Sequence, residues 1–242
     1  MYIVFFLLVL AYLAITSIVD TRKTKRIINI TITEKERIKW YLEAVIWEWG
    51  AILGIVIMCL IGSISFIDIG FRKISFEYNF WFTLITLVLS GLFFLVFLYQ
   101  SISFLVSAEY RDALKEKILK DNDKNYHNAV YENLLIPRTR KDKQVMFCAS
   151  LTAGICEELL LRGFLFFLLR AIFPGISIIL VVIITSVLFG LWHFYQGIQG
   201  IIKTFLFGVL YGCLYLATDS IIPGILFHFL LDFSSTFLLS EE

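Results

Sequence analysis

The chain has 242 residues, of which 59% are hydrophobic and only 17% are charged. A soluble domain carries about a quarter charged residues, and the mean hydropathy here is +0.84, so the composition excludes an ordinary soluble protein. The net charge of +1 gives no sign of a nucleic-acid partner.

Apolar runs long enough to cross a bilayer, which takes about 20 residues, recur along the chain. They predict an all-α fold, a polytopic bundle of transmembrane helices. The first run lacks the basic start and the cleavage site of a signal peptide, so we expect it to remain as an anchor. A further helix within the polar stretch 109–143 would bring the count from seven to eight. The seven expected spans are residues 2–19, 44–66, 80–106, 145–173, 177–194, 200–217 and 220–239.

Most Lys and Arg residues fall in two stretches, 22–39 and 111–143. Connections rich in Lys and Arg stay on the cytoplasmic side of a membrane. With three spans before the second stretch, both can lie on that side, which predicts an external N-terminus and a cytoplasmic C-terminus, in the plasma membrane. We expect two regions: 1–143, an N-terminal transmembrane region with two basic cytoplasmic loops, and 144–242, a catalytic transmembrane domain.

Ionisable side chains inside apolar spans are costly and usually mark function. In this sequence they concentrate in the fourth, fifth and seventh expected spans. The set is Glu157, Glu158 and Arg162, then His193, then His228 and Asp232.

Spacing within this set predicts which side chains meet. Glu158 and Arg162 are four residues apart on one helix face, in the favourable order for an ion pair. Glu157 points about 100° away and lacks that partner, which suits a general base beside histidines. His228 and Asp232 are again four apart, so the carboxylate is expected to orient the ring.

These polar residues form three motifs on separate spans, in the order Glu157-Glu158-x-x-x-Arg162, Phe189-x-x-x-His193 and His228-x-x-x-Asp232. The series resembles the CAAX protease and bacteriocin-processing family, which includes the type II CAAX prenyl endopeptidases and the bacterial Abi proteins. The resemblance covers about residues 145–237.

The resemblance implies an intramembrane endopeptidase. Hydrolysis assisted by a glutamate needs no metal, so we expect no cofactor. By motif position, Glu157 would activate water with the help of His193, while His228 and Asp232 would stabilise the oxyanion. Glu158 and Arg162 would be structural supports. The last motif position is often Asn, and an ionised Asp232 cannot donate a hydrogen bond, so we expect it to orient His228 instead.

Expected partners are membrane lipids and a peptide or protein substrate, including lipidated or membrane-associated ones. Prenylated C-terminal motifs, bacteriocin leaders and signalling-peptide precursors all fit. Three alternatives stay open. Two histidines and a glutamate could hold zinc, although the compact HExxH motif is absent. The chain could be a non-catalytic immunity or peptide-binding protein, or a proton-coupled transporter, although the halves show no repeat.

Overall fold

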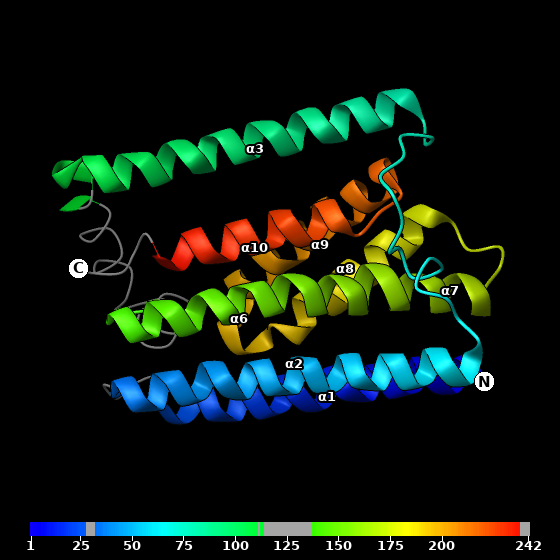
Figure 1. Cartoon of the computed structure of the whole chain (residues 1–242), viewed down its shortest axis with the longest axis horizontal. Helices are drawn as coiled ribbons and strands as arrows, with labels where there is room; N and C mark the ends of the chain where they lie inside the picture. The colour runs from blue at the N-terminus through cyan, green and yellow to red at the C-terminus, as the bar shows by residue number, and fades with distance from the viewer. Residues whose placement is uncertain (28–31, 111, 114–136, 238–242) are drawn as a thin grey trace.

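The computed structural model describes the chain except for residues 28–31, 111, 114–136 and 238–242. Every regular element in this described part is helical, which confirms the predicted all-α bundle (Figure 1). The eighth helix considered within 109–143 falls mainly outside the described residues. The elements are α1 (Tyr2–Ile27), α2 (Glu34–Gly62), α3 (Phe80–Val106), α6 (Arg140–Glu158), η2 (Leu159–Leu165), α7 (Phe166–Ile172), α8 (Ile178–Trp192), η3 (Phe194–Gln196), α9 (Gly197–Thr218) and α10 (Ile222–Phe237).

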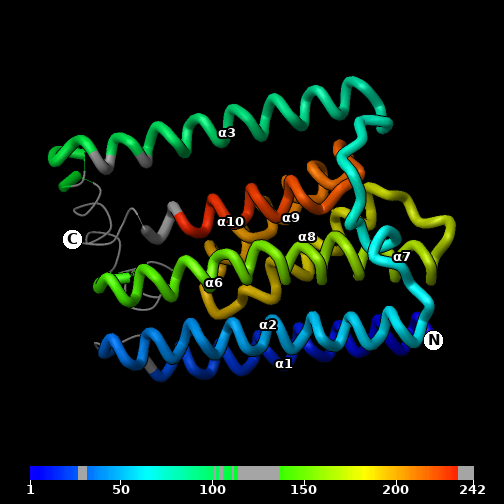
Figure 2. The backbone as a smooth tube through the Cα atoms, viewed as in Figure 1, coloured from blue at the N-terminus to red at the C-terminus, as the bar shows by residue number. Residues whose placement is uncertain are grey.

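Successive long helices run in alternate directions (Figure 1). The end of α1, the starts of α2 and α6, and the ends of α3 and α10 gather at one end of the bundle. We call this the basic end, because the described parts of both basic stretches lie there. The N-terminus and the 63–79 connection lie at the opposite end. Helix α3 is on the far side of α6 and α10 from α1 and α2 (Figure 2).

Four helical segments in the described chain are long and apolar enough to cross a membrane: Tyr2–Arg26, Glu34–Gly62, Phe80–Gln100 and Phe194–Thr218. Helices α8 and α10 are apolar but shorter, with 15 and 16 residues. The seven predicted spans all correspond to helices, and the crossing of a bilayer by each of the seven stays a prediction.

The first basic stretch is more helical than a loop connecting two spans. Helix α1 continues to Ile27, and α2 already begins at Glu34. A capping box explains this early start, because the Thr33 hydroxyl accepts from the Glu36 backbone N–H while the Glu36 carboxylate accepts from Thr33. Helix α2 therefore begins ten residues before the predicted second span, 44–66.

The helix that carries the first motif also departs from the predicted single span. It starts at Arg140, where Thr139 and Asp142 form a second capping box. After Glu158 it changes to a π-helix, η2, before continuing as α7. Such π segments occur often at functional sites, and this one directly follows the paired glutamates.

A buried ion pair ties α2 to α6 at the basic end. Both Nε and Nη2 of Arg37 donate to Oδ2 of Asp142, at 2.9 and 2.6 Å. The two side chains are 3% and 0% exposed. The sequence analysis assigns Arg37 to a basic loop, whereas the structure places it in α2. There its side chain fixes the start of α6, the helix that carries the glutamates.

Small residues allow the helices around the site to approach closely, as is common in membrane bundles. A Cβ atom at Gly154 of α6 would lie 2.9 Å from the Ile225 carbonyl oxygen of α10, and one at Gly190 of α8 would lie 2.9 Å from the Ile201 carbonyl oxygen of α9. Most of η2 is fully buried, whereas large apolar side chains of α1, α2 and α3 are exposed. This pattern places the polar motifs inside and an apolar surface outside.

Candidate active site

The first motif lies at the centre of the bundle, where α6 passes into η2. Glu157 and Glu158 are the last two residues of α6, and Arg162 lies in η2. The side chains of Glu158 and Arg162 are 1% and 0% exposed. Nη1 of Arg162 donates to Oε1 of Glu158 at 2.9 Å, which confirms the predicted pair.

Two aromatic rings and a backbone carbonyl complete the surroundings of Arg162. Its Nη2 donates to the carbonyl oxygen of Gly208 in α9 at 2.9 Å. The guanidinium carbon lies 4.8 Å from the centroid of the Phe189 ring and 5.3 Å from that of Tyr211. These contacts compensate the burial of a full positive charge.

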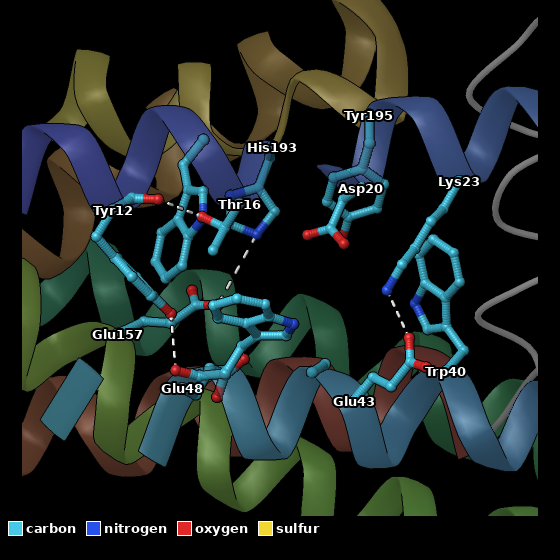
Figure 3. A pocket seen from close by; sticks show the side chains of 13 residues that line it. Tyr12, Thr16, Asp20, Lys23, Trp40, Glu43, Glu48, Glu157, His193 and Tyr195 are labelled. Atoms are coloured by element: carbon cyan, nitrogen blue, oxygen red, sulfur yellow. Dashed lines mark hydrogen bonds and ion pairs between the residues drawn. The ribbon is translucent and has the colours of Figure 1, made fainter. Parts of the chain in front are cut away.

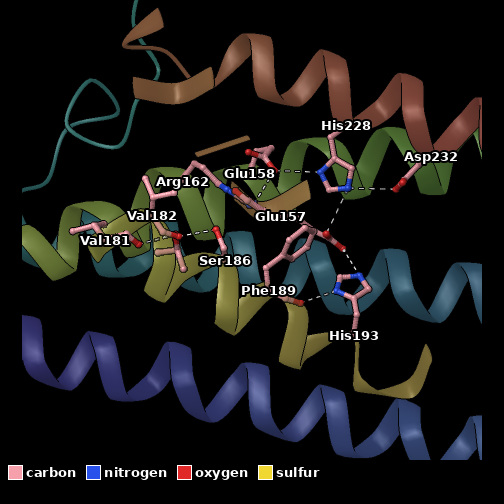
Figure 4. A network of polar contacts seen from close by, with 12 residues as sticks. Glu157, Glu158, Arg162, Val181, Val182, Ser186, Phe189, His193, His228 and Asp232 are labelled. Carbon is pink, nitrogen blue, oxygen red and sulfur yellow. Dashed lines mark hydrogen bonds and ion pairs between the residues drawn. The ribbon is translucent and has the colours of Figure 1, made fainter. Parts of the chain in front are cut away.

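His228 of α10 has a carboxylate at each ring nitrogen (Figure 4). Its Nδ1 lies 3.3 Å from Oε1 of Glu158, and its Nε2 lies 3.4 Å from Oδ2 of Asp232 and 3.7 Å from Oε2 of Glu157. The ring stacks on Tyr211 at a centroid distance of 4.8 Å. The predicted contact with Asp232 is present, but the contact with Glu158 was not foreseen.

His193 approaches Glu157 from the other side. It follows directly after α8 and caps that helix. Its Nδ1 lies 3.0 Å from the carbonyl oxygen of Phe189, to which only a protonated Nδ1 can donate. In the neutral ring Nε2 then carries a lone pair, and this atom lies 3.9 Å from Oε1 of Glu157.

The Glu157 carboxylate thus stands between two imidazole rings that come from α8 and α10. Its side chain is only 8% exposed. The distances of 3.9 and 3.7 Å to His193 and His228 exceed a direct hydrogen bond. They suit a bridging water, which can contact both a carboxylate and an imidazole nitrogen. All six residues singled out in the sequence therefore meet in one site.

A cavity of about 80 Å³ opens in front of Glu157 and His193, enough for several water molecules (Figure 3). It extends between α1 and α2 toward the basic end, where Lys23, Trp40 and Glu43 line it. Glu43 and Glu48 of α2 belong to none of the three sequence motifs. Both line this cavity together with Glu157, and only the fold reveals that.

The zinc alternative gains no support from this geometry. Within the described part of the chain, no group of three or more His, Cys, Asp or Glu side chains has the arrangement of a metal site. Instead, Glu158 is held by Arg162, and His228 is shared among three carboxylates. The side chains that could act as zinc ligands therefore contact one another or Arg162.

A family model described as Type II CAAX prenyl endopeptidase Rce1-like matches residues 142–234. This segment is therefore similar to the CAAX protease family, in agreement with the resemblance carried by the three motifs. The segment contains all six residues of the site, from Glu157 to Asp232. No curated protein and no solved structure matches the chain. This similarity supports an integral membrane protease in general, which agrees with the apolar helices.

Proposed function

We propose that the chain is an intramembrane endopeptidase in which Glu157 activates the attacking water. The observation that carries this proposal is the placement of a buried carboxylate between two imidazoles, at 3.9 and 3.7 Å, beside a cavity. A general base needs to reach its proton directly or through one water. A water in the cavity can donate one hydrogen to Glu157 and the other to the free lone pair of His193.

The reaction then follows from these contacts. Glu157 takes a proton from the water while the water oxygen attacks the peptide carbonyl carbon, and the π electrons of the carbonyl move to its oxygen. The tetrahedral intermediate collapses by breaking the C–N bond, and the proton held by Glu157 passes to the leaving amine. A hydrogen bond to the developing oxyanion is worth several kcal/mol in a site shielded from water.

His228 is the donor that we assign to this oxyanion. Its Nε2 faces Glu157 and Asp232, and its Nδ1 faces Glu158. Glu158 therefore shares with Asp232 the orienting role that we predicted for Asp232 alone. Because Glu158 is 1% exposed and Asp232 is 41% exposed, we expect the Glu158 contact to be the stronger of the two.

Sidedness follows from the positive-inside rule. We assign the basic end to the cytoplasm, with an external N-terminus and a cytoplasmic C-terminus, in the plasma membrane. The cavity extends toward this end, since Lys23 and Trp40 lie there. Water and peptide would enter from the cytoplasmic leaflet. CAAX-type C-termini, bacteriocin leaders and signalling-peptide precursors are the substrate classes proposed, with 144–242 as the catalytic domain.

The test compares peptide termini from cells that carry the wild-type chain with those that carry Glu157→Gln at equal membrane abundance. Loss of a cleavage product in the variant would support the proposal, and the lost product would identify the substrate. If the termini are identical while a wild-type phenotype persists in the variant, the peptidase proposal fails. A non-catalytic immunity or peptide-binding protein would then be the better account.

A further inference from the structure

The walls of the cavity come largely from outside the family segment. Asp20 and Lys23 belong to α1, and Glu43 and Glu48 belong to α2. Both helices precede residue 142, where the family match begins. The chemistry of these walls is therefore a property of this chain, separate from the shared motifs.

Carboxylates and aromatic rings dominate the walls. Asp20, Glu43 and Glu48 line the cavity beside Glu157, and Trp40 is one of several aromatic residues around it. Figure 3 shows the Asp20 carboxylate between His193 and Trp40. Faces of Trp and Tyr rings attract cations, and carboxylates do so more strongly. This combination suits a positively charged ligand.

A cation of the chain itself already occupies the outer part of the cavity. Among the described lining residues, Lys23 is the only Lys or Arg. Its ammonium forms an ion pair with Glu43 and lies 5.8 Å from the centroid of the Trp40 ring. This arrangement demonstrates how a cation binds between a carboxylate and a ring there.

The inner part holds the carboxylates of Glu48 and Glu157, and Glu157 lies 3.9 and 3.7 Å from the ring nitrogens of His193 and His228. Within the described residues, Oε2 of Glu48 and Oε2 of Glu157 are buried and accept no hydrogen bond. The Glu157 side chain is 8% exposed and lines the inner end. Buried carboxylates without hydrogen-bond partners are costly. A ligand cation placed beside them would offset that cost, so the cavity should bind positively charged groups in preference to neutral ones.

We propose that this cavity binds a Lys or Arg side chain of the peptide substrate, close to the bond that is cut. The proposal rests on the endopeptidase function above, because it names the substrate of that site. Thr16 of α1 lies beside the candidate site, since Trp192 donates to its hydroxyl at 2.9 Å. Along α1, Lys23 lies about 10 Å from Thr16. An extended peptide covers this distance with about three residues, so the bound Lys or Arg would lie within about three residues of the bond that is cut.

A binding experiment tests the proposal without requiring cleavage. The full chain is placed in lipid nanodiscs and titrated into two fluorescent, terminally blocked nonapeptide libraries. One library has Lys at its centre and the other has norleucine, which has the same carbon chain without the ammonium, and Lys and Arg are left out elsewhere. We expect the Lys library to bind at least about tenfold more tightly, the effect of an added charge-assisted contact in a shielded site.

Variants with opposite expected effects separate recognition from general damage. Glu48→Gln and Asp20→Asn should each reduce the preference for the Lys library several-fold. Lys23→Met should increase it, because Glu43 then becomes available to the ligand. Glu77→Gln changes an exposed carboxylate at the opposite end and should leave the preference unchanged. A merely structural role would not make the preference move in both directions.

Mass spectrometry of the same samples reports cleavage separately. Equal binding of both libraries, or a preference unaffected by Glu48→Gln and Asp20→Asn, overturns the cation site. If peptides are cut with no basic preference, the peptidase proposal stands and the cation site fails. If the Lys library binds preferentially and no peptide is cut by the wild-type chain, the cation site is supported and the peptidase proposal fails.

Discussion

The Glu158 carboxylate contacts both Arg162 and His228, and replacement of Glu158 by Gln tests both contacts together. Its Oε1 accepts from Arg162 at 2.9 Å and lies 3.3 Å from Nδ1 of His228. The variant replaces the carboxylate with a neutral amide, so the Arg162 guanidinium, which is 0% exposed, loses its negatively charged partner. An uncompensated charge then remains in the core.

Removing one partner of a buried ion pair costs about 3–5 kcal/mol. In a domain of this size each kcal/mol lowers Tm by roughly 2–4 °C. We therefore expect Glu158→Gln to lower Tm by roughly 6–20 °C. Thermal unfolding of detergent-purified protein, followed by circular dichroism, measures this change.

A double variant distinguishes support of the fold from positioning of His228. Glu158→Gln/Arg162→Met removes the unpaired charge, so it should recover much of the lost Tm. It should not recover peptidase activity, because Nδ1 of His228 still lacks its carboxylate. If Glu158→Gln keeps both wild-type Tm and wild-type activity, the reasoning about this buried pair is refuted. Recovery of full activity in the double variant would contradict only the role of Glu158 in positioning His228, and the account of the buried ion pair would stand.

Four further outcomes are expected. Arg37→Met should destabilise the protein by about 3–5 kcal/mol, and Arg37→Met/Asp142→Leu should restore most of this; equal stability of the two variants in a Tm measurement would contradict the account. Gly154→Leu should abolish activity by forcing α6 and α10 apart, whereas Gly50→Ala, with nothing within 4 Å of the added Cβ, should preserve it in the same assay. Asp232→Asn should lower kcat if the carboxylate charge matters, and full activity in this variant would refute that requirement. Activity of purified protein should survive chelation; loss on chelation and return with stoichiometric zinc would favour the metalloprotease alternative.

The predicted fold was largely correct because its signals are local. Apolar runs located the helices, and the i,i+4 spacing predicted the contacts of Glu158 with Arg162 and of His228 with Asp232. Helix starts were placed less accurately. The capping box at Thr33 extends α2 into a charged stretch that hydropathy assigns to a loop.

The remaining features of the site depend on contacts between distant segments. Glu158 meets His228 across 70 residues of sequence, and Arg37 meets Asp142 across 105. Glu48 lies on a span without any motif, and its position beside Glu157 in the cavity depends on how α2 packs against α6. No periodicity within a single helix encodes such a meeting, so the sequence alone could not predict it.

The division of the site between two parts of the chain has an evolutionary consequence. The residues assigned to hydrolysis lie within 142–234, while α1 and α2 supply most of the wall in front of them. Substitutions in the N-terminal hairpin can change which peptides are accepted while the hydrolytic residues stay the same. Under the proposed roles, reaction and selectivity would be inherited on separate segments, and the two properties could diverge at different rates.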